Sequence, residues 1–362
     1  MLAHKGAGSV TAKDATASTH ALLVAQGVVE RRSFEVEPPR PGQVLVDILL
    51  CGVCVAEVKA FQDGSGHGPS LCGHEWVARV RRVGEGVASV AVGDRVAIAV
   101  PDPCDTCPSC RAGRPQFCSL VMSVARGRDE HAPPHGGYAR SLTVAEHRVL
   151  PVGDQISDEQ AAFVEPAAIA HHAVARASVA SGDTVVVLGG GPIGLLCVSL
   201  ARVAGADHVV VIEPSAVRRD AARLCGAHAL VGDAAQAGPV IDELSGGRGA
   251  SVVLECVGTG NSVQQAVDLV RQGGRVVMLG DASTATILPK LWLAKEVTVS
   301  ASAGYSREDI RQVVGLMASG CIATDPLHTR TVGLTALAEV LGDLGGGQSR
   351  EIKVLVDPRR PD

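Results

Sequence analysis

Alternation of hydrophobic and polar residues characterises positions 20–100 of the chain. Alternating stretches such as 43–48 and 94–98 are separated by turns rich in glycine and proline. A period of two places successive side chains on opposite faces of a strand, so this region is predicted to be rich in β-strands. Four cysteines interrupt the pattern within residues 101–119, and short strands and loops are predicted again over 120–155.

From about residue 183 the pattern changes to apolar strands that alternate with helical stretches. Strands are predicted over residues 184–188, 208–212, 251–254 and 275–279. A glycine turn and a helix to about residue 204 follow the first of these strands, and a second helical stretch covers 262–271. Strands that alternate with helices predict a parallel sheet with right-handed crossovers. The chain ends in a further predicted strand, 352–356.

These patterns predict an α/β protein in which a β-rich domain precedes a doubly wound parallel-sheet domain of Rossmann type. The predicted boundaries are a flexible tail at 1–20, a catalytic domain at 21–165, a cofactor domain at 166–305, and a return to the catalytic domain at 306–362. A ligand cleft is expected between the two domains.

Composition excludes several classes of protein. Hydrophobic residues make up 46% of the 362 residues, so the chain can bury a large core, whereas a net charge of −5 argues against nucleic-acid binding. The most apolar stretch, 185–201, contains four glycines and Pro192, and it is interpreted as strand, turn and helix instead of a membrane span. Eleven cysteines without an export signal favour metal binding over disulfides and predict a cytoplasmic protein.

A glycine-rich motif follows the strand 184–188 directly. Gly189 would permit a tight turn, Gly191 would let the backbone approach a pyrophosphate, and Gly194 would let helix and strand pack closely. Pro192 and Ile193 open the predicted helix, whose N-terminus supplies N–H donors. This arrangement is typical of a dinucleotide site.

An acidic residue supports the same interpretation. Glu213 follows Gly194 by nineteen residues at the end of the next strand, where a carboxylate would hold the ribose hydroxyls. Because Glu213 would repel a 2′-phosphate, NAD is expected and NADP is less favoured. Arg218 and Arg219 would soften that preference, or would be solvated helix charges.

Two candidate metal sites follow from the cysteines and from residues scattered along the first domain. Four thiols lie within fifteen residues, a spacing typical of a closed structural zinc site: Cys104, Cys107, Cys110 and Cys118. An iron–sulfur site or spare thiols are the alternatives. Cys54, His74 with Glu75, and Glu165 would form a second, mixed zinc site with a position open to substrate.

The order of these motifs resembles the medium-chain dehydrogenase/reductase superfamily, in its zinc-containing alcohol and polyol dehydrogenase branch. Further matching pieces are Val92–Val96, Gly137–Ala139, Glu255–Gly258 and Ile352–Leu355, and the resemblance covers residues from about 20 to 358. It implies a GroES-like catalytic domain with a zinc lobe at 101–119, two zinc ions per subunit, and a homodimer or homotetramer. It implies hydride transfer between NAD(H) and an alcohol or carbonyl substrate, and the aromatic content of only 2% favours a small polar one.

The resemblance also implies ligand roles. Cys54 and His74 would bind the catalytic zinc, and Glu75 and Glu165 would share the carboxylate role, with Glu165 preferred as the direct ligand. His171 and His172, which follow Glu165, are expected on a helix surface or in the core.

The chain departs from the family pattern after Cys54. Ala56 stands where the family has a Ser or Thr that relays the substrate proton, Glu57 stands at an Asp position, and Lys59 at a His position. In one hypothesis a carboxylate (Glu57 or Glu75), Lys59 or a water takes the proton of an alcohol. In a second the enzyme reduces an activated C=C or C=N bond. In a third the protein binds NAD and zinc but has lost turnover.

Overall fold

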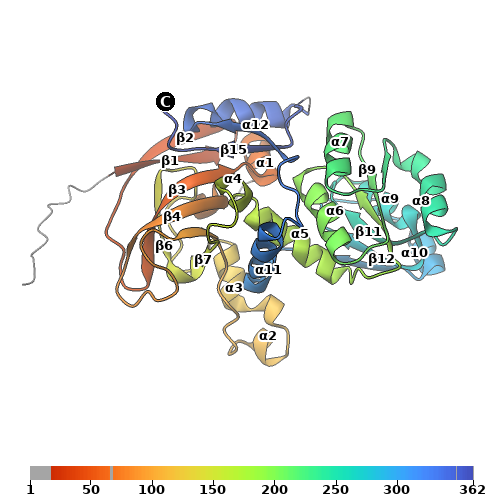
Figure 1. Cartoon of the computed structure of the whole chain (residues 1–362), viewed down its shortest axis with the longest axis horizontal. Helices are drawn as coiled ribbons and strands as arrows, with labels where there is room; N and C mark the ends of the chain where they lie inside the picture. Colours follow the sequence, from red (N-terminus) through yellow and green to blue (C-terminus); the bar gives the residue numbers. More distant parts are fainter. Residues whose placement is uncertain (1–17, 66–67, 348, 362) are drawn as a thin grey trace, which may run out of the picture.

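The computed structural model describes residues 18–65, 68–347 and 349–361, which fold into two lobes (Figure 1). Between the lobes lie two helices that pack on each other, α5 (Val164–Arg176) and α11 (Arg307–Ala318). The small helices α2 (Pro108–Arg111) and α3 (Ser119–Ala125) project from the first lobe. Among the described residues, no helix combines the length and the apolar character needed to cross a bilayer.

The first lobe is built on a mixed sheet whose strands run in the order β14-β15-β3-β4-β5-β7, with β6 also paired to β3. Its strands are β3 (Gln43–Gly52), β4 (Glu75–Val83), β5 (Arg95–Ile98), β6 (Ser141–Ala145), β7 (Val149–Pro151), β14 (His328–Val332) and β15 (Lys353–Val356). A hairpin of β1 (Ser18–Ala25) and β2 (Val28–Glu35) lies beside this sheet, bridged to it at Ala21 and Ala139.

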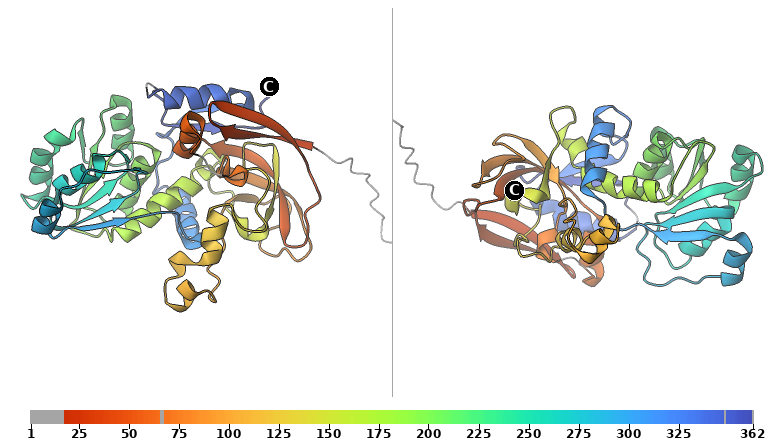
Figure 2. Two further views of the ribbon diagram at one scale, coloured as in Figure 1. Left: turned by 180° about the vertical axis from the view of Figure 1, so that it is seen from behind. Right: turned by 90° about the horizontal axis from the view of Figure 1, so that it is seen from below.

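Short helices complete the first lobe. They are α1 (Val55–Asp63), α4 (Asp158–Ala161) and α12 (Leu337–Gly345), with the 3-10 turns η1 (Pro69–Leu71), η2 (Pro115–Phe117), η3 (Glu146–Arg148) and η5 (Leu334–Ala336). The core of this lobe collects inward-facing strand residues such as Ile48 and Val96 around Trp76 and Tyr138. Because β15 and α12 belong to this lobe, the C-terminal segment returns to the domain in which the chain begins (Figure 2).

The second lobe is an all-parallel, six-stranded sheet. Its strands are β8 (Thr184–Leu188), β9 (His208–Ile212), β10 (Ala229–Val231), β11 (Ala250–Glu255), β12 (Val270–Met278) and β13 (Thr298–Ala301). Their spatial order is β10-β9-β8-β11-β12-β13, which is the 3-2-1-4-5-6 order of a Rossmann sheet. The predicted α/β fold, with a doubly wound parallel sheet, is confirmed.

Helices cover both faces of this sheet. They are α6 (Pro192–Val203), α7 (Ala216–Leu224), α8 (Ala237–Ser245), α9 (Ser262–Leu269) and α10 (Pro289–Lys295), with the turn η4 (Ala234–Gln236). Alternate residues of β8 enter different cores: Val185 and Val187 pack with residues of α5 and α6, whereas Val186 and Leu188 pack with residues of α8 and α9. Burial on both faces explains why these strands are continuously apolar.

Some predicted boundaries differ from the structure. The predicted tail ran to residue 20, but β1 begins at Ser18, so residues 18–20 belong to a strand; residues 1–17 lie outside the described residues. The helical stretch predicted over 262–271 ends at Leu269, because the chain enters β12 at Val270. The predicted domain boundary at residues 165 and 166 falls inside α5, so one helix spans it.

Candidate functional site

The turn between β3 and α1 presents Cys54 to His74. Cys54 is the N-cap of α1, and Glu57 at the third helical position accepts a hydrogen bond from the Cys54 backbone N–H at 3.1 Å, as in a capping box. The other oxygen of Glu57 accepts from the Gly73 N–H at 3.1 Å and lies 2.9 Å from His74 Nδ1. Glu57 therefore ties the two segments that carry Cys54 and His74.

The hydrogen bonds of His74 fix the tautomer of its ring. Its Nδ1 lies 3.0 Å from the Leu71 carbonyl oxygen as well as near Glu57. Because both of these partners are acceptors, Nδ1 carries a proton, and Nε2 is the ring nitrogen that would bind a metal ion. Ligand atoms of Cys54, Glu57 and His74 all lie within 4.8 Å of one another.

A second group shares the same imidazole. Ligand atoms of His74, Glu75 and Glu165 also lie within 4.8 Å of one another. Glu75 opens β4, and Glu165 lies in the first turn of α5. The predicted set of Cys54, His74 and Glu165 is thus distributed over two groups that meet at His74, and at this radius they do not form a single group within the described part of the chain.

The chemistry of this donor set fits a divalent cation. Glu57 and Glu75 are each only 2% exposed, and Glu165 is 9% exposed. Burial raises the pKa of Glu165 to about 7, against the opposing effect of the His74 charge, and burial likewise raises the pKa of the Cys54 thiol. Several anionic oxygens and a thiol concentrated out of water are costly unless a positive charge neutralises them. Thiolate, imidazole and carboxylate ligands are those that zinc prefers.

A buried lysine provides part of the neutralising charge. Lys353, at the start of β15, is 2% exposed, forms an ion pair with Glu75, and donates to the Val53 carbonyl oxygen at 3.0 Å. We did not predict this residue as part of the site. Its only sequence signal was its place in the closing stretch Ile352–Leu355.

Lys59 connects the two lobes near this cluster. Its Nζ lies 3.0 Å from both the backbone oxygen and the Oδ2 of Asp281, which follows β12 in the second lobe. This contact brings α1, which starts beside Cys54, to the carboxyl edge of the parallel sheet. Ala56 is half-buried in the first turn of α1. The placements of Glu57 and Lys59 favour positioning roles over the proton transfer that was one hypothesis for them.

The four-cysteine lobe forms the other concentration of metal-binding groups. The ligand atoms of Cys104, Cys107, Cys110 and Cys118 lie within 4.8 Å of one another, and the Cys104 N–H donates to the Cys118 sulfur at 3.3 Å. Backbone N–H groups of Cys110 and Ser119 lower the pKa of Cys107 to about 5, whereas burial and the sulfurs of Cys107 and Cys118 raise that of Cys110 to about 12. Four cysteine sulfurs held this closely match the donor set of a tetrahedral zinc ion, which would bind them as thiolates.

Cys107→Ser is expected to remove one zinc per subunit and to lower the melting temperature by at least about 5 °C, because binding of zinc contributes to the stability of its loop. Metal analysis and thermal denaturation measure both effects. The matched control is Cys321→Ser, because Cys321 is exposed and belongs to none of the three metal-binding groups. Unchanged zinc content in Cys107→Ser would refute the assignment.

The glycine motif forms the turn between β8 and α6. Gly189 has a φ of +102°, which favours glycine, and a Cβ on Gly194 would collide with the Gly189 carbonyl oxygen. By contrast, a Cβ on Gly191 would meet nothing within 4 Å, so the chain is open to an approaching group there. Gly191 is the N-cap of α6, makes no side-chain cap hydrogen bond, and is followed by Pro192 and Ile193. The uncapped helix N-terminus suits a pyrophosphate.

Glu213 closes this turn from the next strand. Its Oε2 accepts from the Gly190 N–H at 2.7 Å, and its Oε1 accepts from the Ser215 N–H at 2.9 Å. A carboxylate has about four lone-pair positions, so it retains capacity for ribose hydroxyls. Arg219 donates to the carbonyl oxygens of Glu213 and Pro214, at 2.7 Å each. The neighbouring Arg218 is half-buried.

Two histidines and a tyrosine lie on or next to the helices α5 and α11. His171 and His172 contact the two carboxylate oxygens of Asp309 at 2.7 and 3.1 Å, so they join α5 to α11, in agreement with the core or surface role expected for them. Tyr305, which sequence reasoning missed, precedes α11; burial raises its pKa, and so does the nearby Glu165. Nothing in its local sequence marks this tyrosine, because its neighbours are brought together by tertiary packing.

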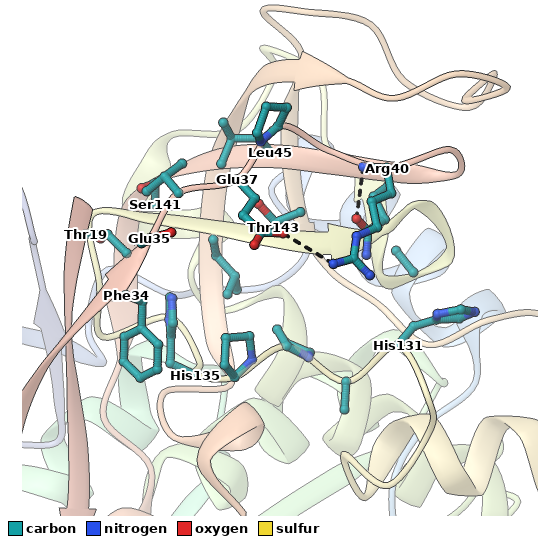
Figure 3. Close-up of a pocket in the computed structure, with 18 of the residues that line it drawn as sticks. Thr19, Phe34, Glu35, Glu37, Arg40, Leu45, His131, His135, Ser141 and Thr143 are labelled. Atoms are coloured by element: carbon teal, nitrogen blue, oxygen red, sulfur yellow. Dashed lines mark hydrogen bonds and ion pairs between the residues drawn. The ribbon is translucent and has the colours of Figure 1, made fainter. Parts of the chain in front are cut away.

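Two cavities in the described part of the chain lie away from the metal-binding groups. A cavity of about 630 Å³ opens on the outer side of the first lobe between β2, β6 and the segment around His131 and His135 (Figure 3). A smaller one, of about 190 Å³, lies among α5, α6 and α11. Neither is lined by Cys54, His74 or Glu165, so the ligand cleft expected between the domains stays a prediction.

Comparison with known proteins extends this picture. The family model for the alcohol dehydrogenase GroES-like domain matches residues 40–154, and the model for zinc-binding dehydrogenases matches residues 192–319. D-xylulose reductase A of Aspergillus oryzae is 31% identical over 86% of this chain and 88% of that protein.

Solved structures agree in fold. A Sinorhizobium meliloti protein described as a zinc-binding dehydrogenase, solved with NADP, is 30% identical with a TM-score of 0.82, over 94% of this chain and 100% of that one. The 2R,3R-butanediol dehydrogenase of Bacillus subtilis is 28% identical with a TM-score of 0.80, over 95% and 100%. The chain therefore belongs to the zinc-dependent alcohol and polyol dehydrogenase branch of the medium-chain dehydrogenase/reductase superfamily, as a zinc-containing oxidoreductase with a nicotinamide cofactor.

Proposed function

We propose that this enzyme interconverts a small polyol, or a comparable polar alcohol, and its carbonyl form, with NAD(H) as the hydride carrier. The observation that carries the proposal is that the group with Cys54 and the group with Glu165 share the imidazole of His74. Lys59 joins the helix next to Cys54 to the carboxyl edge of the parallel sheet. Ligands bind beyond the carboxyl ends of such sheets. The names of the D-xylulose and butanediol relatives support a polyhydroxylated substrate.

In this proposal the subunit binds two zinc ions and one dinucleotide, each through a different set of residues. Cys54, His74 and Glu165 would hold the catalytic zinc, with Glu75 beside them, and the four cysteines of the lobe would hold the structural one. A zinc ion supplies a Lewis acid for the substrate oxygen, and a nicotinamide ring supplies or accepts the hydride. Glu57 and the Leu71 carbonyl hold the imidazole in one tautomer and orientation.

NAD is favoured over NADP in the proposal. Glu213 is 5% exposed and its carboxylate is held by two backbone N–H groups at the cofactor end of β9. A 2′-phosphate would meet this fixed negative charge in a poorly hydrated position, which is unfavourable. Arg219 donates through Nη1 to two carbonyl oxygens, which holds its side chain against the backbone beside Glu213.

The steady-state reduction of D-xylulose and of a panel of other small ketoses and hydroxyketones tests the proposal. NADH-dependent turnover is expected with at least one of them, and NADPH is expected to be at least about tenfold less efficient. No hydride transfer to any member of the panel would contradict the proposal. Turnover confined to activated C=C or C=N substrates would favour the second hypothesis.

Ala56→Ser is expected to raise kcat for alcohol oxidation by about tenfold, because a positioned proton-transfer group contributes about 10²–10⁴-fold where it is missing and unsubstituted. Ala56 is half-buried in the first turn of α1, next to the Cys54 N-cap. Rates from pH 6 to 9 measure the effect. If the variant gains nothing at any pH, another group already moves the proton or the natural reaction does not need it.

A homodimer formed through the cofactor domain completes the proposal. Eleven free cysteines suit a reducing compartment such as the cytoplasm, which is the proposed location. Within the described residues, β13 ends the parallel sheet without a neighbour, and α10 beside it exposes Leu293, which is 80% exposed, near the exposed Leu288. An exposed apolar patch beside an open strand edge is typical of an interface. Leu293→Glu is expected to shift the species in light scattering towards the monomer, and a wild-type monomer would refute the interface.

A further inference from the structure

Lys59 of the first lobe makes a double contact with Asp281 of the second. Its Nζ lies 3.0 Å from the Asp281 backbone oxygen and 3.0 Å from its Oδ2, and 222 positions separate the two residues in the sequence. Helix α1, which carries Lys59, lies on the side of the first lobe that faces the second (Figure 1). The contact therefore joins the two lobes directly, in addition to the connection through α5 and α11.

At the lysine end of this contact, α1 is fixed to the metal-binding groups. The helix begins after Cys54, and Glu57 accepts from the Cys54 N–H at 3.1 Å and lies 2.9 Å from His74 Nδ1. Near the other end of the helix, Gln62 donates to the carbonyl oxygen of the last residue of α12 at 2.8 Å. Because both ends of α1 are held, Lys59 has a fixed position relative to Cys54.

At the aspartate end, the loop that follows β12 is held against the end of β11. The Glu255 carbonyl oxygen accepts from the Gly280 N–H at 3.0 Å, and its buried carboxylate accepts from the N–H groups of Val257 and Gly258 at 2.8 Å each. A Cβ on Gly258 would lie 2.6 Å from the Asp281 nitrogen. The loop that carries Asp281 is thus in close backbone contact with the loop that follows β11.

Val257 extends this contact to the dinucleotide turn. A Cβ on Gly189 would lie 2.8 Å from Val257 Cγ2 and 3.3 Å from the Cys256 carbonyl oxygen, so the two segments pack tightly. Contacts therefore run without a gap from α1 through Lys59, Asp281 and Val257 to the first glycine of the motif. Packed contacts of this kind can carry an energetic coupling between two sites, and a measurement of coupling is what demonstrates it.

We propose that Lys59 is a positioning residue whose contact with Asp281 holds the metal-binding side of the first lobe against the dinucleotide turn and thereby slows the release of NADH. The inference rests on the proposed function, since it requires NADH to bind at the turn that begins with Gly189. The lysine acts through Asp281 and does not touch the cofactor. This assigns a role to a residue at which the chain departs from the family pattern.

The size of the effect follows from the exposure of the pair. The side chain of Lys59 is 36% exposed and that of Asp281 is 87% exposed. An ion pair in contact with water changes an equilibrium constant by about fivefold at most, because water screens the two charges. Loss of the contact is therefore expected to change the release of NADH by about fivefold.

The dissociation rate of NADH from the zinc-loaded enzyme, measured by stopped-flow fluorescence without substrate, tests the proposal. Lys59→Met and Asp281→Asn are each expected to raise this rate about fivefold. The double variant is expected to raise it no further, because either substitution removes the same ion pair. Arg330→Met is the matched control: Arg330 is also 36% exposed, but its ion pair with Glu339 lies within the first lobe, so the rate is expected to stay unchanged.

Hydrogen exchange of the enzyme without NADH gives a second readout. Backbone amides of residues 279–284 are expected to exchange at least about twofold faster in Lys59→Met and in Asp281→Asn, and at the wild-type rate in Arg330→Met, because the loop has lost its contact with the first lobe.

Three results would overturn the inference. They are unchanged NADH release in both single variants, additive effects in the double variant, and an effect of Lys59→Met that Asp281→Asn does not share, since the lysine would then act on NADH itself. Unchanged exchange of residues 279–284 in both variants would overturn it as well. A wild-type enzyme that does not bind NADH would instead overturn the proposed function.

Discussion

Replacement of His74 with Ala is expected to lower kcat/KM for the carbonyl substrate by about 10³-fold or more. The imidazole belongs to both groups of metal-binding side chains, so its removal leaves neither group complete. A Lewis acid contributes several kcal/mol to the barrier, and each 1.36 kcal/mol is a factor of ten in rate. Steady-state kinetics of the purified variant measure the loss.

The control for this experiment is His131→Ala. The side chain of His131 is 55% exposed and lies on the rim of the outer cavity, away from the metal groups. Its substitution is expected to leave kcat/KM unchanged, and NADH binding is expected to persist in both variants because the dinucleotide turn is in the other lobe. Activity of His74→Ala within tenfold of the wild type would contradict the proposed metal centre.

The second large effect is expected at the cofactor. Glu213→Ser should weaken NAD(H) binding by about 10²-fold. Each hydrogen bond to a charged group contributes about 1.5–3 kcal/mol. In the proposal the carboxylate would bind the ribose hydroxyls, and it already accepts from the N–H groups of Gly190 and Ser215 in the glycine turn. Titration of NADH fluorescence gives the dissociation constants.

Asp220→Ser separates this effect from a general loss of negative charge. Asp220 lies on α7 with a side chain that is 71% exposed, paired only with the neighbouring Arg223. NADH affinity should not change in this control, and NADPH binding should improve in Glu213→Ser relative to NADH. If NADH binds Glu213→Ser as tightly as the wild type, the carboxylate does not hold the ribose.

The features that could be predicted are those whose residues lie close together in the sequence. The four cysteines lie within fifteen residues, and the glycine turn with Glu213 is confined to one strand–helix–strand unit, so local pattern was sufficient to place both. Strand β8 was predicted with the bounds that it has, because its two buried faces give an uninterrupted apolar run.

The parts that could not be predicted are pairings between distant segments. Lys353 meets Val53 across 300 residues, and Lys59 meets Asp281 across 222. A lysine in a sequence gives no sign of being buried, because burial depends on which carboxylate the fold brings to it. The same holds for Glu57, one of the candidates for taking the proton that Ala56 cannot relay, because its contacts with Gly73 and His74 depend on the fold.

The zinc content of the purified subunit tests the central claim most directly. The account predicts two zinc ions per wild-type subunit, one in Cys54→Ser, and one in Cys107→Ser, with the ion lost from a different site in each variant. A single zinc in the wild type that survives Cys54→Ser and disappears in Cys107→Ser would contradict the account, because Cys54, His74 and Glu165 would then hold no metal.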